Sequence, residues 1–207
     1  MTNTKKLILF TRYPEAGKTK TRLIPALGEE GAAALQREMT EHSLRQVQPL
    51  LSQLSLQLDI QFAGGNEALM RDWLGTELQY TPQAAGDLGQ RLQTAFSQAF
   101  AQGMQRVVIM GIDCPDLDAN LIKQAFEKLA TVDLVLGEAE DGGYYLIGLR
   151  RLIPALFTGI AWGTSSVLAT TMEKAKAAGC AIATLPVLND IDYPEDLVLW
   201  EKHKMGG

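Results

Sequence analysis

Cysteine is scarce in this sequence, with two residues in a chain of 207. Cys114 and Cys180 do not have the close spacing of zinc ligands, and no secretory signal segment indicates an oxidising compartment. The sequence therefore predicts neither a structural zinc site nor a disulfide framework.

Long hydrophobic runs are also missing, most visibly near the N-terminus. Lys5 and Lys6 precede only the four apolar residues 7–10, and Thr11 and Arg12 end this run. A signal peptide needs a longer apolar core, and a helix that crosses a membrane needs about 20 mostly apolar residues. We therefore expect a cytoplasmic protein without a membrane span.

Positive charge is outweighed by negative charge. The chain has 19 Lys and Arg residues against 24 Asp and Glu residues, for a net charge of −5. A broad surface for nucleic acid or for an anionic membrane would need the opposite balance. The composition argues against a nucleic-acid partner, although it is compatible with a local basic pocket.

Two glycine motifs of nucleotide-binding proteins are absent. Gly17-Lys18-Thr19 matches the end of a P-loop, but Arg12 stands where that motif needs its first glycine. The sequence also has no G-x-G-x-x-G, so the dinucleotide fingerprint of a Rossmann fold is excluded.

What is present is the pattern of an ordinary globular protein, with 46% hydrophobic and 21% charged residues. Short apolar runs alternate with helical patterns, which predicts one α/β domain over residues 1–207. We expect strands at 7–10, 56–63, 78–81, 132–137, 144–147 and 181–187 and from Val107, and helices at 29–51, 68–74, 121–129 and 165–178, after Asp87 and after Pro194.

Several local features of these elements can be predicted as well. Strand 56–63 alternates apolar and polar residues, so one of its faces should be solvated or packed differently. Strand 144–147 should be antiparallel, because a tight turn leads into it. Thr164 or Ser165 is expected to cap helix 165–178. Residues 202–207 are expected to fray.

The stretch 107–116, VVIMGIDCPD, is typical of a strand buried on both faces of a mainly parallel sheet. Pro115 prevents further sheet pairing, and Asp116 or Asp118 can cap a helix that begins near Ala119. Asp113 thus follows the carboxyl end of a central strand, where ligands of open α/β sheets bind. Asp113 is either a ligand-binding residue or an ordinary turn residue.

The segment 11–28 has no sustained helical or strand period and is expected to be a loop. It carries four cations in an acidic protein: Arg12, Lys18, Lys20 and Arg22. Guanidinium and ammonium groups bind phosphate oxygens, so the segment predicts a site for a phosphate-bearing ligand. A solvated basic loop is the alternative.

Polar residues also follow three other elements. Asp87 should cap the next helix, and Gly86 would let a ligand approach that helix start closely. Asp141 stands before two glycines in a turn that needs no ligand to explain it. Asp190 and Asp192 form a second carboxylate pair after a strand.

Six blocks occur in order along nearly the whole chain: PEAGKTKTRL at 14–23, GDLGQRL at 86–92, GIDCPDL at 111–117, EDGGYYLIGL at 140–149, WGTSSVL at 162–168 and DIDYPEDL at 190–197. Together they resemble bacterial nucleotide-diphospho-sugar transferases of the glycosyltransferase-A fold, a group associated with arsenosugar biosynthesis. The basic loop and the ending are also similar to phospholactate and molybdenum-cofactor guanylyltransferases. Ile112 and Gly163 depart from the pattern, which has Ser at both positions, and Lys18-Thr19 stands where the pattern often has Val. No charged group is lost.

The resemblance implies a three-layer α/β/α fold with a mixed, mainly parallel sheet. It implies a divalent cation, Mg²⁺ or Mn²⁺, whose preference for oxygen ligands suits carboxylates, phosphates and water. The implied site residues are Asp113 and Asp192 for the metal; Arg12, Lys20, Arg22, Gly86 and Asp87 for the nucleotide and its phosphates; Gly143, Tyr144 and Trp162 beside the acceptor; and Asp141 as general base.

Two activities fit these residues. In the first, a sugar moves from a nucleotide-sugar donor to a hydroxyl of a small-molecule acceptor. In the second, a nucleoside monophosphate moves from a triphosphate to a phosphorylated acceptor and pyrophosphate leaves. The family resemblance favours the first, and a nucleotide-binding module without catalysis is a third reading. The base, the sugar, the acceptor, the stereochemical course and the oligomeric state stay open.

Overall fold

The computed structural model describes residues 4–206, which form a seven-stranded sheet in the order β3-β2-β1-β4-β6-β5-β7. Neighbouring strands are parallel except around β6, which is antiparallel to both β4 and β5. The strands are β1 (Lys5–Arg12), β2 (Leu56–Ala63), β3 (Gln79–Pro82), β4 (Arg106–Met110), β5 (Leu134–Ala139), β6 (Tyr144–Leu149) and β7 (Ile182–Leu188).

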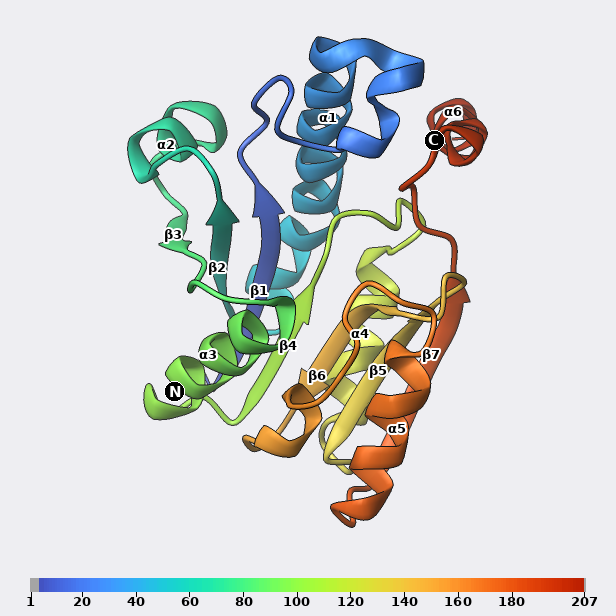
Figure 1. Ribbon diagram of the computed structural model, residues 1–207. Coiled ribbons are helices and arrows are strands. Elements are labelled where there is room, and N and C mark those ends of the chain that lie inside the picture. The colour runs from blue at the N-terminus through green and yellow to red at the C-terminus, as the bar shows by residue number, and fades with distance from the viewer. Residues whose placement is uncertain (1–3, 207) are drawn as a thin grey trace.

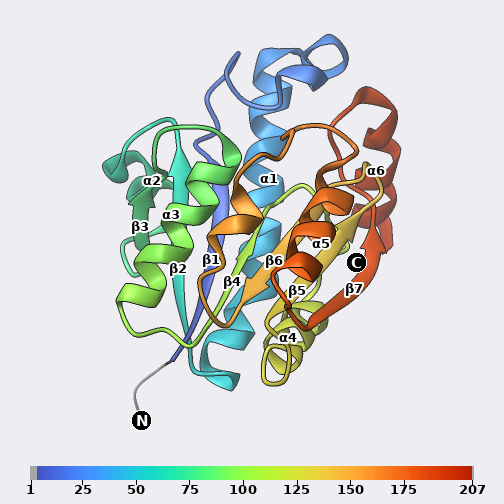
Figure 2. The same ribbon diagram turned by 60° about the horizontal axis from the view of Figure 1, so that its bottom comes forward.

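Helices cover both faces of this sheet, α1 and α4 on one face and α3 and α5 on the other (Figures 1 and 2). The helices are α1 (Ile24–Gln53), α2 (Glu67–Leu74), α3 (Leu88–Ala101), α4 (Ala119–Lys128), α5 (Val167–Ala177) and α6 (Leu197–Gly206), with 3-10 turns η1 (Thr21–Leu23), η2 (Pro154–Phe157) and η3 (Pro194–Asp196). The predicted fold class, three layers around a mixed, mainly parallel sheet, is confirmed.

The central strands are apolar without alternation because both of their faces are buried. Leu7 and Leu9 of β1 pack in the hydrophobic core under α1 and α4, whereas Ile8 between them packs in the core under α3. All three side chains are fully buried. Burial on both faces explains the short continuous apolar runs.

Strand β2 is different, because its polar face is exposed only at Gln57 and is buried further along the strand. Asp59 and Gln61 are almost completely buried, and Asp59 accepts hydrogen bonds from Gln61 Nε2 at 3.1 Å and Thr81 Oγ1 at 2.8 Å. Lys6 of β1 lies 3.4 Å from Asp59 Oδ2 and donates to Gln102 Oε1 at the end of α3. The differently packed face is therefore a buried polar network.

The structure corrects three local predictions. Segment 11–28 is not all loop: β1 continues to Arg12, η1 follows, and α1 begins at Ile24, with a kink where Gly28 has φ 71°. The kink interrupts the helical period and so hid this first turn. The N-cap of α5 is Ser166, without a side-chain cap, because Thr164 Oγ1 donates to Ala161 O instead.

The C-terminal residues are the third correction. Helix α6 continues to Gly206, where a frayed tail was expected from residue 202, and position 207 lies outside the described residues. Trp200 anchors the helix: its side chain is buried, and its Nε1 donates to Glu38 Oε2 of α1 at 3.3 Å. Tertiary contact thus stabilises a segment that local propensity left undecided.

The carboxyl ends of the parallel strands lie along one edge of the sheet, the upper edge in Figure 1. The loops after β1, β4, β5 and β7 therefore gather there, and four of the six sequence blocks lie in them or begin in them. No helix in the described part of the chain is long and apolar enough to span a membrane.

Candidate active site

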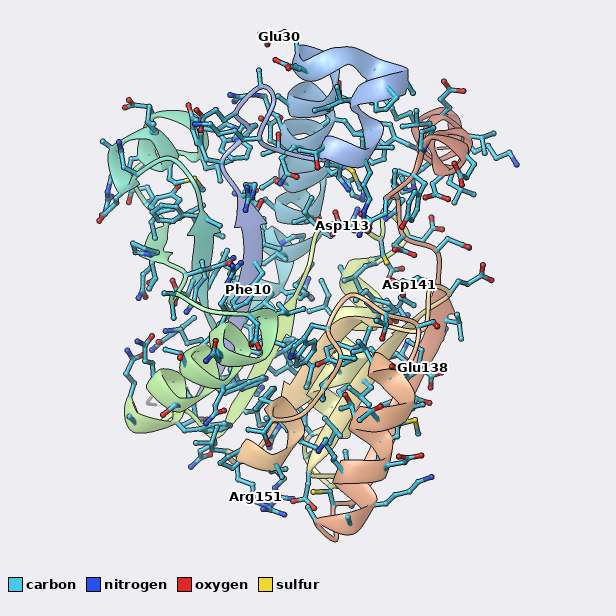
Figure 3. The ribbon with its side chains drawn as sticks, in the orientation of Figure 1. Phe10, Glu30, Asp113, Glu138, Asp141 and Arg151 are labelled. Atoms are coloured by element: carbon cyan, nitrogen blue, oxygen red, sulfur yellow. The ribbon has the colours of Figure 1, made fainter. Side chains whose placement is uncertain are left out.

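Asp113 lies just beyond the end of β4, and Asp141 beyond the end of β5 (Figure 3). The backbone of Asp113 joins two distant loops, because the amide of Ile191, after β7, donates to its carbonyl at 2.9 Å. Helix α4 is capped by Asp118, whose Oδ1 accepts from the Leu121 amide at 2.8 Å, so Asp113 is not needed as a cap. Its carboxylate faces the basic loop after β1.

Lys20 of that basic loop connects the two carboxylates predicted to bind metal. Its Nζ donates to Asp113 Oδ1 and to the Ile191 carbonyl, both at 2.6 Å, and lies 3.8 Å from Asp192 Oδ1. The Lys20 side chain is 5% exposed, whereas Asp113 is 47% exposed. The backbone of Lys20 is left-handed, with φ 43° and ψ 46°. The loop therefore holds an ammonium group between two partly exposed carboxylates.

Arg22 reinforces the second of these carboxylates. Its NH1 atom donates to Asp192 Oδ2 at 3.1 Å, and its guanidinium carbon lies 5.0 Å from the centre of the Tyr193 ring. Arg22 thus binds the loop after β7 and does not line the larger cavity described below.

The larger cavity of the site has a volume of about 400 Å³ and lies over the ends of β1 and β4. Three of the residues that line it are cations: Arg12, Lys20 and Arg91 of α3. Lys18 of the basic loop does not line it and pairs with Glu15 at the surface, at 2.6 Å. The structure therefore brings together two of the four cations of the loop and adds a third from α3.

Gly86 and Asp87 lie beside this cavity but do not line it. Asp87 forms a capping box with Gln90: its Oδ1 accepts from the Gln90 amide at 2.8 Å, and Gln90 Oε1 accepts from the Asp87 amide at 2.9 Å. Gly86 has φ 110° and its carbonyl accepts from Arg91 Nε at 3.0 Å. These residues fix the start of α3 and the orientation of Arg91.

A second cavity of about 190 Å³ adjoins the first and contains the predicted acceptor-side residues. Asp141, Gly143, Tyr144 and Trp162 all line it. The Tyr144 and Trp162 rings meet edge to face, with centroids 6.4 Å apart. Asp113 and Asp192 line both cavities and so mark the boundary between them.

Two glycines allow the loop 158–166 to form the outer wall of this second cavity. A Cβ on Gly89 of α3 would lie 2.5 Å from the Phe157 carbonyl oxygen and 2.6 Å from Trp162 Nε1. A Cβ on Gly142, which has φ 87°, would collide with the Ser165 backbone. Gly89 therefore serves close packing against Trp162 rather than the approach of a ligand.

Asp141 is held by its own turn. Its Oδ1 accepts from the Gly143 amide at 2.7 Å, and the side chain is exposed. Its other oxygen, Oδ2, has no hydrogen-bond partner within residues 4–206. One oxygen thus orients the carboxylate while the other is without a partner in a residue that lines the cavity. Cys114, which also lines this cavity, is no rival nucleophile, because burial and the nearby Asp113 carboxylate raise the pKa of its thiol.

Crowding of carboxylates perturbs the loop after β7. Burial, the Asp113 charge and the Asp141 charge raise the pKa of Asp192, while Lys20 and Arg22 act against this rise. Burial and then the Asp141 charge raise the pKa of Asp190 from 3.8 to about 6. A site with unneutralised negative charge attracts cations.

Replacement of Asp190 by asparagine is expected to stabilise the metal-free fold above pH 6. A folded-state pKa raised from 3.8 to about 6 favours the protonated acid, so the wild type loses stability as pH rises through this window. The asparagine side chain carries no charge and avoids this loss. Urea unfolding with a chelator should show that the stability of Asp190→Asn relative to the wild type increases from about pH 3.5 to pH 7. A difference that is constant with pH would contradict the prediction.

The carboxylates at the boundary of the two cavities fit a divalent cation. No group of three or more His, Cys, Asp or Glu side chains between residues 4 and 206 is arranged to hold a metal ion. Asp113 and Asp192 nevertheless offer hard oxygen atoms, and one cation, the Lys20 ammonium, already lies between them. Two carboxylates suffice for Mg²⁺ or Mn²⁺ when phosphate and water complete the shell.

Sequence reasoning overlooked three residues of the site. Asp190 was recognised only as a neighbour of Asp192, yet it lines the second cavity. Gln36 and Gln83 line the first cavity and make hydrogen bonds to the backbone of strands β1 and β2. Gln36 Nε2 donates to the Arg12 carbonyl at 3.2 Å, and Gln83 Nε2 donates to the Gln61 carbonyl at 3.0 Å. A glutamine within the apolar stripe of α1 was the available signal for Gln36.

Three solved structures are similar to this chain. A candidate nucleotide-diphospho-sugar transferase from Desulfovibrio desulfuricans G20 has 37% sequence identity and a TM-score of 0.90, over 98% of this chain and 89% of that one. A nucleotidyl transferase from a Methanothermobacter species has 11% identity and a TM-score of 0.64, over 99% of each chain. Glucosyl-3-phosphoglycerate synthase from Mycobacterium tuberculosis, solved with Mn²⁺, UDP and phosphoglyceric acid, has 14% identity and a TM-score of 0.57, over 95% of this chain and 73% of that one.

The last two similarities show a shared fold, and the first extends to the sequence. The names of these three proteins are those of transferases of the two kinds that the sequence predicted. A search of curated proteins gave no significant match. A family model described as "Uncharacterized protein conserved in bacteria (DUF2064)" matches residues 46–164, more than half of the chain. The chain therefore belongs to the DUF2064 family and is similar in fold and sequence to the candidate nucleotide-diphospho-sugar transferase from Desulfovibrio desulfuricans.

Proposed function

We propose that this protein transfers a sugar from a nucleotide-diphospho-sugar donor to a hydroxyl group of a small-molecule acceptor, with a divalent cation bound at Asp113 and Asp192. The observation that carries the proposal is the division of the cleft by charge. Arg12, Lys20 and Arg91 line the larger cavity, whereas the smaller cavity is lined by carboxylates and aromatic rings. The two carboxylates implied in metal binding stand at the boundary between the halves.

The larger cavity suits the nucleotide diphosphate. Arg12 and Lys20 supply positive charge at the end of β1, and Arg91, oriented by the Gly86 carbonyl, supplies it from α3. When bound, a divalent cation supplies further neutralisation of the diphosphate leaving group. Asp113 and Asp192 would hold it with their carboxylate oxygens.

The smaller cavity suits the acceptor, and Asp141 is proposed as its general base. For an inverting transfer, a carboxylate must accept the proton of the attacking hydroxyl. The Gly143 amide holds Asp141 Oδ1 at 2.7 Å and leaves Oδ2 available. Trp162 and Tyr144 line this cavity and supply the apolar surface beside which an acceptor would lie.

Nucleotidyl transfer is the second candidate, since three cations in the larger cavity could also bind a triphosphate. Its acceptor would have to bring a phosphate group next to Asp113 and Asp192. The smaller cavity offers four carboxylates and, among residues 4–206, no basic side chain to receive that phosphate. The electrostatics therefore favour glycosyl transfer.

A thermal-shift panel of nucleoside diphosphates, nucleotide sugars and nucleoside triphosphates tests the proposal. Each ligand is measured with Mn²⁺, with Mg²⁺ and with a chelator. A ligand present at about 100 times its dissociation constant stabilises the folded protein by about 2.7 kcal/mol, which is easily measured. We expect one nucleotide sugar and its diphosphate product to stabilise the protein only when metal is present.

Two variants make this test specific. Asp113→Asn should abolish the metal-dependent part of the stabilisation, because an amide is a poor substitute for an ionised ligand. Lys18→Met is the matched control, since Lys18 belongs to the same basic loop but pairs with Glu15 outside the cavity. Stabilisation by triphosphates alone would support nucleotidyl transfer instead. Metal-dependent binding that is unchanged in Asp113→Asn would show that Asp113 does not bind the metal.

A further inference from the structure

The smaller cavity has an unusual charge balance for a site that receives a substrate. Its wall contains Asp113, Asp141, Asp190 and Asp192, and no lysine, arginine or histidine of residues 4–206 lines it. Nearby cations act from outside: Lys20 contacts Asp113 from the larger cavity, and Arg22 binds Asp192 at the surface. The cavity is therefore an acidic compartment joined to a basic one.

A metal ion at the boundary would neutralise only part of this charge. Asp113 and Asp192 line both cavities and would face such an ion. Asp141 and Asp190 line only the smaller cavity and have no ion-pair partner in the described residues. All four carboxylates line the same cavity of about 190 Å³. The acceptor therefore meets at least two uncompensated carboxylates.

We propose that the acceptor is a polyhydroxyl compound that carries no phosphate or carboxylate group, so that it is neutral or cationic. This inference rests on the proposed glycosyl transfer. Ionised carboxylates only accept hydrogen bonds, and hydroxyl or ammonium groups supply the donors that they need. A phosphate offers acceptors only and is repelled by the same carboxylates.

The aromatic wall fits this class of acceptor. Trp162 and Tyr144 both line the cavity, and their rings meet at an interplanar angle of 86°. Their apolar surfaces suit the carbon framework of a sugar or polyol, and a tryptophan face also accepts a cationic group. Gly89 and Gly142 hold this wall in place because larger residues would collide with the loop 158–166.

The test uses pairs of probes that differ by one phosphate group: glycerol with glycerol 3-phosphate, and glucose with glucose 6-phosphate. The protein is first saturated with diamagnetic Mg²⁺ and the nucleoside diphosphate that stabilises it, so that the larger cavity is filled. Binding of each probe is then measured by saturation-transfer NMR and titration. We expect the neutral member of a pair to bind, and the phosphorylated member to bind at least about tenfold more weakly because of repulsion.

Charge removal makes the test independent of which neutral probe binds best. Asp141→Asn/Asp190→Asn should strengthen the binding of the phosphorylated probes about tenfold or more. Glu140→Gln/Glu195→Gln is the matched control, because it removes the same charge from exposed positions that do not line the cavity. We expect no comparable gain from the control.

Three results would overturn the inference: equal or tighter binding of the phosphorylated probes to the wild type, no gain in Asp141→Asn/Asp190→Asn, or no binding of any neutral probe. Failure of the proposed function would be seen earlier and separately, as the absence of metal-dependent stabilisation by any nucleoside diphosphate. If a nucleoside diphosphate stabilises the protein in the presence of metal but phosphorylated probes bind more tightly than neutral ones, the proposed donor site is supported and the proposed class of acceptor is wrong.

Discussion

Replacement of Lys20 by methionine is expected to change two affinities in opposite directions. Nucleotide binding with metal should weaken about a hundredfold, since hydrogen bonds to charged groups contribute about 1.5–3 kcal/mol each. Binding of Mn²⁺ without nucleotide should become stronger. The reason is that the Lys20 ammonium lies 2.6 Å from Asp113 Oδ1 and 3.8 Å from Asp192 Oδ1, where it competes with any other cation.

The competition follows from where Lys20 is held. Its side chain is almost fully buried, and the Ile191 carbonyl fixes its Nζ at 2.6 Å, so the ammonium stays beside the carboxylates until a ligand draws it away. In the methionine variant the two carboxylates repel each other without compensation, which favours a divalent ion. Phosphate binding loses the same ammonium and has no replacement for it.

Two measurements separate these effects. Electron paramagnetic resonance of free Mn²⁺ gives the affinity for metal alone, and thermal shift gives the affinity for metal with nucleotide. Lys18→Met serves as control, because that lysine is exposed and pairs with Glu15. A Lys20→Met variant that binds Mn²⁺ as weakly as the wild type, or more weakly, would show that the lysine does not occupy the cation position.

The second large effect concerns stability and lies far from the site. Asp59→Leu is expected to cost about 3–5 kcal/mol, because it leaves the Lys6 ammonium buried without its countercharge. The two side chains are 2–3% exposed and lie 3.4 Å apart beneath α3. Gln102 Oε1 remains a partner for Lys6, but a neutral oxygen does not replace a carboxylate.

Urea unfolding measures this cost, and a double variant identifies its origin. Lys6→Met/Asp59→Leu should recover most of the lost stability, because an apolar pair of similar size leaves no buried charge. Glu15→Gln is the matched control, since it removes a shorter but exposed ion pair and should cost less than about 1 kcal/mol. If the double variant is no more stable than Asp59→Leu, the loss comes from packing or from the hydrogen bonds of Gln61 and Thr81 to Asp59, and not from the buried charge of Lys6.

Local signals were sufficient for much of the fold. Strand β2 occupies residues 56–63 as its period of two predicted, and Asp87 caps α3 as its position before the helical pattern predicted. The antiparallel direction of β6 followed from the Asp-Gly turn before it. Each of these features depends on residues close together in the sequence, where propensity and hydrogen-bond geometry act directly.

The ordered sequence blocks determined the family and the fold class, and they placed Asp113, Asp141 and Asp192 after strand ends. The tertiary structure alone decided which charges meet. Lys20 contacts Asp113 across 93 positions of sequence and the Ile191 carbonyl across 171. The tertiary structure also places the cations in one cavity and most of the carboxylates in the neighbouring one. The order of strands sets these pairings, and no local pattern contains that order, because it depends on how distant segments bury their apolar faces together.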